Sequence, residues 1–279
     1  MDDLVTNAEN TWCPGCGNFG IFNAFKKAVR ILEERGVGLD RIVVTAGIGC
    51  HGKILDYLKI SGFYSLHGRA LATAQGIKIA NPDLKVIAFV GDGDALGEGI
   101  AHLIFAAKRN ADITVIVHDN GVYGLTTGQY TPTSKKGYKG PSTPGGSVEE
   151  PLNPITLMLE AGATFVARGY SARLDQLADL IVQAVEHEGF SFIDVLQPCV
   201  SYNDTYRDYN QAVVNLPAVI ENRETAAQLA RTTDRIQTGV FFRAIKPVYH
   251  KELLRDQNPG TDRTDRSARQ KNVNALISK

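Results

Sequence analysis

The stretch that most constrains the fold runs from residue 85 to residue 128. The apolar run 85–90 predicts a buried parallel strand. Apolar residues recur at helical spacing over 96–107, and 113–117 is a second buried run. Such a strand–helix–strand unit brings the carboxyl ends of both strands to one edge of a parallel sheet, where open α/β sheets bind their ligands.

Polar residues stand at the carboxyl end of both predicted strands. Asp92 lies between two glycines directly after the first strand, and Asn120 closes the second. A carboxylate and an amide oxygen are hard ligands that suit Mg²⁺, and glycines let the backbone approach a phosphate. Taken alone, a Gly-Asp-Gly turn also fits a tight turn whose aspartate caps the next helix.

The Gly-Asp-Gly turn together with the downstream asparagine resembles the thiamine diphosphate signature, which holds a magnesium ion on the cofactor's diphosphate. Related sequences often carry Asn-Asn where this chain has Asp119-Asn120. The resemblance implies Asp92 and Asn120 as magnesium ligands, with the main-chain carbonyl of Val122 as the third.

Alternation of strands and helices continues along the chain. Helices are predicted over 18–35, 70–80, 154–161 and 172–188, and strands over 41–46, 163–167 and 191–196. This order predicts a doubly wound α/β domain over residues 1–200, with a mainly parallel sheet and helices on both faces. Residues 201–279 are more polar, with a helix at 222–231 and a strand at 239–245. We expect this C-terminal extension to be an appendage that packs on a partner subunit.

Residues 126–153 interrupt the alternation. The segment is rich in Gly, Pro, Thr, Ser and Lys and has little apolar periodicity. A loop of this length is either functional or disordered. Because it leaves directly from the predicted magnesium site, we favour a lid or a partner-contacting segment. A mobile surface loop is the alternative.

The four cysteines do not suggest a disulfide-stapled secreted module in a chain of 279 residues. Cys13 and Cys16 form a C-x-x-C, and Cys50 and Cys199 each follow a predicted strand. They therefore converge on the edge of the sheet that carries Asp92. Four thiolates suit either zinc or an iron–sulfur cluster, and spacing alone does not separate the two. A thioredoxin-like pair would need more chain upstream of Cys13, and ordinary buried cysteines would need no ligand at all.

Charge and hydropathy narrow the functional class. The formal net charge at pH 7 is +0, which gives no electrostatic footprint for nucleic acid or an anionic membrane. The N-terminus lacks a basic-then-apolar signal, and no apolar run approaches the roughly 18 residues that a membrane span needs. We expect a cytoplasmic protein.

Five motifs, in this order, resemble one family. They are CPGCG from residue 13, GIGC from 47, LHGRA from 66, GDGDALGEG from 91 and N-x-x-YGLTTGQYTPTS from 120. Together they resemble the β subunit of a 2-oxoacid:ferredoxin oxidoreductase, over about residues 10–200. The resemblance implies the thiamine diphosphate-binding fold. It also implies one [4Fe–4S] cluster on Cys13, Cys16, Cys50 and Cys199.

The resemblance implies an activity as well. A 2-oxoacid is decarboxylated oxidatively to an acyl-CoA, with CoA as co-substrate, and electrons pass through the cluster to an external ferredoxin. We expect 2-oxoglutarate slightly ahead of pyruvate as the substrate. The glutamate that activates the cofactor's aminopyrimidine ring is expected from an α subunit, in an αβ or (αβ)₂ assembly. This chain offers no plausible candidate for it, although Glu98 lies near the sheet edge in sequence.

Site residues are carried over at matching positions. The predicted cofactor contacts are Gly49, His67, Gly91, Asp92, Gly93, Asp94, Asn120, Val122, Gly124, Leu125 and Thr126. The predicted catalytic residues are Lys53, His67 and Arg69, and the predicted substrate contacts are Lys53, Leu125 and Thr127. Some relatives carry Lys where this chain has Thr127. A helix-entry hydrogen bond is the alternative role for His67 and Arg69, and a solvated lysine for Lys53.

Two further functions fit parts of the pattern. A non-redox thiamine diphosphate lyase or synthase subunit would use the cysteines for zinc or for nothing. A non-catalytic electron-relay subunit would have lost the cofactor, but the intact Asp92 and Asn120 argue against it.

Overall fold

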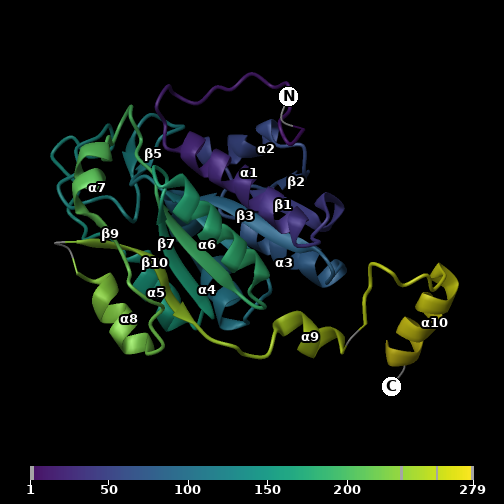
Figure 1. The fold of residues 1–279 in the computed structure, drawn as a ribbon. Helices are drawn as coiled ribbons and strands as arrows, with labels where there is room; N and C mark the ends of the chain where they lie inside the picture. Colours follow the sequence, from purple (N-terminus) through teal and green to yellow (C-terminus); the bar gives the residue numbers. More distant parts are fainter. Residues whose placement is uncertain (1–2, 233–234, 256, 278–279) are drawn as a thin grey trace.

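The computed structural model describes residues 3–232, 235–255 and 257–277. Its centre is an eight-stranded sheet in the order β2-β1-β3-β4-β8-β7-β10-β9 (Figure 1). The strands are β1 (Ile42–Ala46), β2 (Ser61–Tyr64), β3 (Lys85–Gly91), β4 (Thr114–Asp119), β7 (Phe165–Tyr170), β8 (Ser191–Leu196), β9 (Val213–Asn215) and β10 (Ile236–Arg243). The short strands β5 (Val122–Tyr123) and β6 (Gln129–Tyr130) form a separate antiparallel ribbon.

Neighbouring strands of the main sheet run parallel, except that β10 runs antiparallel to β7. The register is level at the carboxyl ends, where Gly91 of β3 pairs with His118 of β4. Asp119 of β4 in turn pairs with Leu196 of β8. The residues that follow these three strands therefore meet at one edge. The predicted doubly wound, mainly parallel sheet is confirmed.

Helices cover both faces of the sheet. They are α1 (Asn18–Glu34), α2 (Ile54–Tyr57), α3 (Ala70–Ala80), α4 (Ile100–Lys108), α5 (Pro154–Ala161), α6 (Leu174–Glu186), α7 (Tyr206–Ala212), α8 (Arg223–Ala230), α9 (Tyr249–Leu254) and α10 (Arg266–Ile277). Short helical segments are η1 (Leu39–Arg41), η2 (Cys50–Lys53) and η3 (Gly93–Glu98). One apolar cluster lies under α1 and α6, and a second lies under α3, α4, α5 and α8.

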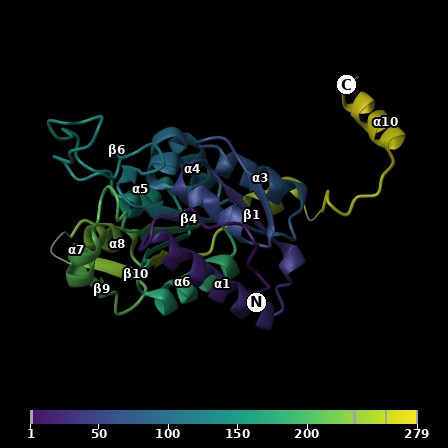
Figure 2. The same cartoon turned by 90° about the horizontal axis from the view of Figure 1, so that it is seen from above.

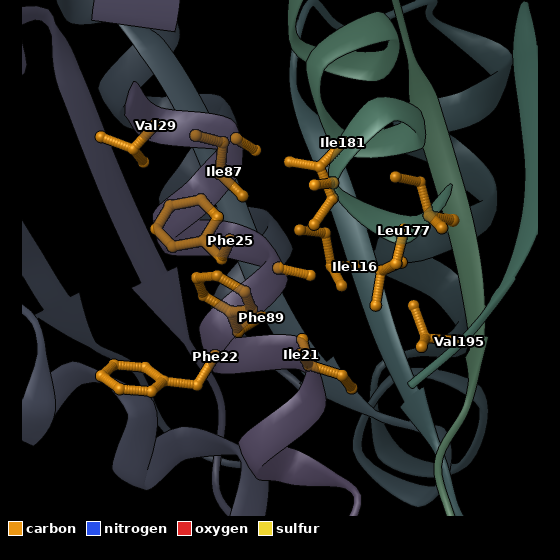
Figure 3. Packing of buried hydrophobic residues seen from close by; sticks show 14 of the residues in the cluster. Ile21, Phe22, Phe25, Val29, Ile87, Phe89, Ile116, Leu177, Ile181 and Val195 are labelled. Atoms are coloured by element: carbon orange, nitrogen blue, oxygen red, sulfur yellow. The ribbon is translucent and has the colours of Figure 1, made fainter. Parts of the chain in front are cut away.

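The packing under α1 follows from its apolar stripe. Ile21, Phe25 and Val29 recur at four-residue spacing, so they share one face of the helix. Figure 3 shows this face against Phe89 of β3, with Ile181 of α6 alongside. The rings of Phe25 and Phe89 meet edge to face, with centroids 4.9 Å apart. This packing fixes the amino end of α1 at the carboxyl edge of the sheet.

The segment after β3 departs from a regular helix. Residues Gly93–Glu98 form the π-helical segment η3 before α4 begins. A Cβ added to Gly93 would lie 2.3 Å from the ring of Tyr123, so only glycine admits this close approach. π-Helical segments often occur at functional sites, and this one borders the candidate site.

The chain after residue 200 contributes to the sheet before it leaves the domain. β10 pairs with β7, and β9 forms the edge beside β10. In both views α10 stands apart from the domain, and the segment around β6 projects at the opposite end (Figures 1 and 2). That residues 201–279 pack on a partner stays a prediction. None of the helices in the described ranges has the length and apolar character to cross a bilayer.

Candidate functional site

A pocket opens at the carboxyl edge of the sheet, and we call it the rim pocket. Its lining is Ile48, Gly49, Cys50, His51, His67, Gly91, Asp92, Gly93, Asp94, Asn120, Val122, Tyr123, Gly124, Leu125 and Thr126. Every residue predicted to contact a cofactor is in this lining. Ile48, His51 and Tyr123 also line it, although they were not among the predicted cofactor contacts. Strand ends far apart in the chain thus form one concave site.

Asp92 lies in this pocket with its side chain fixed from one side. The hydroxyls of Thr131 and Thr133 each lie 2.6 Å from its Oδ2. Asp92 is 2% exposed. Burial raises the pKa of this carboxyl, and the two threonine hydroxyls oppose the rise. Both threonines come from the long 126–153 segment, which therefore supports the site directly.

Asn120 faces the same pocket with a defined amide orientation. Its Oδ1 accepts a hydrogen bond from the Val122 backbone N–H at 2.9 Å. Its Nδ2 donates to Gln197 Oε1 at 3.0 Å. An amide oxygen has two lone pairs, so Oδ1 keeps the capacity to bind a cation. Asp92, Asn120 and the backbone carbonyl of Val122 carry oxygen atoms of the kind that Mg²⁺ prefers, so these residues could hold this ion.

Asp94 connects the two turns that complete the pocket. Its Oδ1 accepts from the backbone N–H of Gly68 at 2.7 Å and of Ile48 at 3.3 Å. His67 Nδ1 lies 2.8 Å from the same oxygen, and His51 Nε2 lies 3.5 Å from Oδ2. Burial alone would raise the pKa of Asp94, but the nearby His51, followed by the Gly68 N–H and His67, lowers it. Asp94 thus holds both histidines at the pocket.

A second cavity adjoins the first, and we call it the cysteine cavity. Its lining is Thr11, Trp12, Cys13, Cys16, Asn18, Cys50, Lys53, Asn120, Gly124, Leu125, Gln197, Cys199, Val200, Ser201 and Tyr202. All four cysteines are free thiols, and all four line this cavity. Cys50, Asn120, Gly124 and Leu125 line both cavities. The convergence expected from the sequence is therefore present.

Polar groups approach the cysteine sulfurs. Ser201 Oγ donates to Cys13 Sγ at 3.2 Å, and Gln197 Nε2 donates to Cys16 Sγ at 3.6 Å. Burial raises the pKa of the Cys16 thiol to about 11, and the charges of the other three cysteines add to the rise. Burial also raises the pKa of Cys50. A bound metal cation would reverse this preference, because metal binding deprotonates a thiol.

The thiols surround space rather than a single point. Within the described residues, no three side chains of the His, Cys, Asp or Glu type form a group that could hold one metal ion. The cavity that the cysteines share measures about 180 Å³. A Cβ added to Gly124 would lie 3.6 Å from Cys50 Sγ and 3.7 Å from Cys199 Sγ. A side chain at this glycine would therefore project toward both sulfurs.

Three of the predicted catalytic and substrate-binding residues lie outside the rim pocket. Lys53 lines only the cysteine cavity. The Arg69 guanidinium donates to the carbonyls of Gly68 and Glu98, and Arg69 is in the lining of neither cavity. Thr127 has a φ of +76° and donates to the neighbouring Thr126 carbonyl, also outside both linings. Their catalytic and substrate-binding roles stay predictions.

Two protein-family models match most of the chain. The model described as "Thiamine pyrophosphate enzyme, C-terminal TPP binding domain" matches residues 47–195. The model for the C-terminal part of the pyruvate ferredoxin oxidoreductase β chain matches residues 199–256. The first match contains the whole lining of the rim pocket, and the second begins at Cys199.

Individual relatives agree with these models. The chain is 44% identical over 268 residues to a 2-oxoacid:ferredoxin oxidoreductase subunit beta from Sulfolobus sp, covering 90% of this chain and 87% of the relative. It is 43% identical over 202 residues to the 2-oxoglutarate oxidoreductase subunit KorB of Mycobacterium tuberculosis, covering 72% of this chain and 53% of the relative.

A solved structure extends the agreement to the fold. The 2-oxoglutarate:ferredoxin oxidoreductase from Magnetococcus marinus, with 2-oxoglutarate, coenzyme A and succinyl-CoA bound, superposes with a TM-score of 0.89. The identity is 34%, and the match covers 98% of this chain and 94% of the solved chain. With its rim pocket and cysteine cavity side by side, this chain belongs to the β subunits of the 2-oxoacid:ferredoxin oxidoreductases.

Proposed function

We propose that this β subunit, joined to an α partner, binds thiamine diphosphate and Mg²⁺ in the rim pocket and one [4Fe–4S] cluster in the cysteine cavity. The complex catalyses the CoA-dependent oxidative decarboxylation of a 2-oxoacid and passes the electrons to ferredoxin in the cytoplasm. One observation carries the proposal: Cys50, Asn120, Gly124 and Leu125 form a wall common to both cavities. Groups bound on either side of that wall would be neighbours, as electron exchange between them requires.

The donor set fits the magnesium ion and its cofactor. Asp92 and Asn120 offer one carboxylate and one amide oxygen, and the carbonyl of Val122 is the predicted third ligand. The hydroxyls of Thr131 and Thr133 hold the carboxylate of Asp92 in one orientation. Gly91 and Gly93 flank this carboxylate in the pocket lining, where a Cβ would collide with His51 or with the ring of Tyr123.

The cysteine arrangement favours a cluster over zinc. A zinc ion draws its four sulfurs to about 2.3 Å from one point. Here the four thiols instead line a cavity of about 180 Å³, and no three of them, among the described residues, form a single-ion site. A cluster occupies volume between its ligands, and each cysteine binds a different iron.

The chain's own residues prepare the reaction around these groups. When bound, thiamine diphosphate supplies an electron sink for decarboxylation, and the cluster supplies one-electron transfer. Asp94 orients His67 and His51 at the rim pocket. Lys53 places a cation in the lining of the cysteine cavity, where it would favour the binding of a substrate carboxylate. Leu125 contributes an apolar side chain to the wall between the cavities.

We propose that the α subunit docks on exposed apolar residues at this side of the molecule. Leu66 is 78% exposed, and Phe63 on the edge strand β2 is 54% exposed. Ile48 and Leu125 are also exposed, and both line the rim pocket. Apolar surface of this kind marks a protein–protein interface. A partner seated here would bring its glutamate to the cofactor.

The substrate class follows from the relatives. The names of the Mycobacterium tuberculosis relative and of the Magnetococcus marinus enzyme both specify 2-oxoglutarate. We therefore propose 2-oxoglutarate ahead of pyruvate.

Anaerobic purification of the αβ complex tests the proposal. We expect a brown protein with about four irons and four sulfides per β chain, as one [4Fe–4S] cluster requires. Assays with 2-oxoglutarate and pyruvate, CoA and ferredoxin should then show turnover that depends on thiamine diphosphate and Mg²⁺. The isolated β chain should show none. A colourless complex with one zinc per β chain would overturn the redox function.

A further inference from the structure

Gln197 joins the two cavities through hydrogen bonds. It follows β8 directly and is 1% exposed. Its Oε1 accepts from Asn120 Nδ2 at 3.0 Å. Its Nε2 donates to the Pro198 carbonyl at 2.7 Å and to Cys16 Sγ at 3.6 Å. One buried amide thus touches a residue of the rim pocket and a cysteine of the adjoining cavity.

The direction of these hydrogen bonds is fixed at both ends by backbone groups. The Val122 backbone N–H can only donate, so it sets Asn120 Oδ1 as the acceptor and turns Asn120 Nδ2 toward Gln197. The Pro198 carbonyl can only accept, so it sets Gln197 Nε2 as the donor. The second hydrogen of Nε2 is then directed to the Cys16 sulfur. Exchanging the oxygen and nitrogen positions of either side-chain amide would place two donors or two acceptors opposite each other.

We propose that Gln197 is a positioning residue for both cofactor sites: it orients the Asn120 oxygen toward magnesium and donates an N–H···S hydrogen bond to the cluster ligand Cys16. This inference rests on the proposed function. Outer hydrogen-bond partners of a metal ligand typically alter metal affinity by 10- to 100-fold. Hydrogen bonds to cluster sulfurs stabilise the more negative reduced state, which raises the reduction potential.

A second donor in the cysteine cavity provides a matched control. Ser201 Oγ donates to Cys13 Sγ at 3.2 Å. This hydroxyl acts on a cysteine, whereas the Gln197 amide contacts both Asn120 and a cysteine. Removing the Ser201 hydroxyl should therefore change the reduction potential of the cluster and leave the Mg²⁺ affinity unchanged.

Three variants of the αβ complex separate the two roles. Gln197→Met keeps a similar volume and removes the hydrogen bonds to Asn120, to the Pro198 carbonyl and to Cys16. Gln197→Glu keeps an acceptor for Asn120 and removes the donor to Cys16. Ser201→Ala removes only the donor to Cys13. Cluster potentials are measured by redox titration with electron paramagnetic resonance. Mg²⁺ affinity is measured by calorimetry on complex depleted of metal, at saturating thiamine diphosphate.

The expected pattern differs for each variant. Gln197→Met should weaken Mg²⁺ binding about tenfold. It should also disfavour cluster reduction by about tenfold, a shift of about 59 mV to more negative potential for one electron. Gln197→Glu should lower the potential but leave Mg²⁺ affinity at or above the unsubstituted level. Ser201→Ala should lower the potential alone.

The results that overturn the inference are distinct from a failure of the proposed function. If Gln197→Met lowers only the thermal stability and leaves both the potential and the Mg²⁺ affinity unchanged, Gln197 is a structural residue and the inference fails. If the unsubstituted complex holds zinc instead of iron, the proposed function fails. In that case the Mg²⁺ affinity of Gln197→Met still tests the role of Gln197, because an unchanged affinity would overturn the inference.

Discussion

The two ends of the sheet bury polar groups in opposite ways. At the amino end, Asn110 uses the full hydrogen-bonding capacity of its amide within the chain. Its Oδ1 accepts from Thr164 Oγ1 at 2.7 Å and from the Phe190 N–H at 2.8 Å. Its Nδ2 donates to the carbonyls of Lys246 at 3.2 Å and Pro247 at 3.1 Å. These bonds tie the segment after β10 to the sheet.

An ion pair at the same end is also complete. Lys78 Nζ lies 2.7 Å from Asp112 Oδ2 and donates to the Leu84 carbonyl at 2.8 Å. Burial lowers the pKa of Lys78, and the charge of Asp112 opposes the fall. Burial alone would raise the pKa of Asp112, but the charge and hydrogen bond of Lys78 lower it. Each charge is therefore balanced by the other.

At the carboxyl end, some buried polar atoms are left without a partner instead. Asn18 Nδ2, beside the cysteine cavity, and His118 Nε2, at the end of β4, have no hydrogen-bond partner in the described part of the protein. Near the amino end, His250 Nδ1 is likewise a buried atom without a hydrogen-bond partner in the described part of the protein. A buried polar group without a partner costs free energy, and its presence calls for an explanation. The comparison indicates that the amino end serves stability and the carboxyl end serves ligands.

The largest expected effect comes from Asp92→Asn. Asparagine can still accept from Thr131 and Thr133, but it loses the charge that binds Mg²⁺. Because outer-sphere changes already cost 10- to 100-fold in affinity, loss of the ligand charge should weaken Mg²⁺ binding by more than about 100-fold and remove turnover. The thermal midpoint of the metal-depleted αβ complex should not fall, because a buried carboxyl is costly. A large loss of stability with normal Mg²⁺ binding would contradict the comparison.

Much of this carboxyl-end site was predictable from the sequence. Apolar runs marked β1, β3, β4, β7 and β8, and their polar ends had to meet once those strands were parallel. Local patterns could not show which side chains support the ligands. Thr131 is 39 residues from Asp92, and Gln197 is 77 residues from Asn120. Contacts at such separations arise only when the chain folds.

Two further elements had no sequence signal for a related reason. All four residues of β2 are exposed, so the apolar pattern that reveals a buried strand is missing. The 126–153 segment has little apolar periodicity, yet its hydroxyls fix Asp92 and Tyr138 donates to the Gly128 carbonyl at 3.2 Å. Hydrogen bonding rather than apolar burial organises that segment. Its role as a lid or partner contact stays a prediction.

Breaking the ion pair at the amino end should give the next largest effect. Lys78→Met leaves Asp112 buried without its cation, which typically costs about 3–5 kcal/mol of unfolding free energy. The double variant Lys78→Met/Asp112→Leu should recover most of that loss, because no unpaired charge remains. Denaturant unfolding of the αβ complex measures both. Mg²⁺ affinity should match the unsubstituted protein throughout, and a parallel loss of affinity would argue against two independent ends.

Asn110→Ala should cost about 3 kcal/mol of unfolding free energy. It leaves the Phe190 N–H and two carbonyls without their partner. It also places alanine at a φ of +51°, which adds about 1–2 kcal/mol of backbone strain. Asn110→Gly removes the same hydrogen bonds without that strain, so it should be the milder variant. Equal losses in the two variants would mean that the hydrogen bonds account for the whole effect.

The smallest expected effects come from two threonines, one at each end of the sheet. Thr133→Val keeps the shape of the side chain and removes one of the two hydroxyls on Asp92, while Thr131 keeps the other. A hydrogen bond contributes about 1 kcal/mol net, so Mg²⁺ affinity should fall by about fivefold. Thr164→Val removes the hydroxyl that donates to Asn110, so it should lower the unfolding free energy by about 1 kcal/mol and leave Mg²⁺ affinity unchanged. Calorimetric titration gives the Mg²⁺ affinity of each variant in the αβ complex, and denaturant unfolding gives its unfolding free energy. Thr133→Val could instead lower stability more than Mg²⁺ affinity, or Thr164→Val could weaken Mg²⁺ binding. Either result would mean that the polar networks at the two ends are coupled through the strands between them. The division between stability at one end and ligand binding at the other would then not hold.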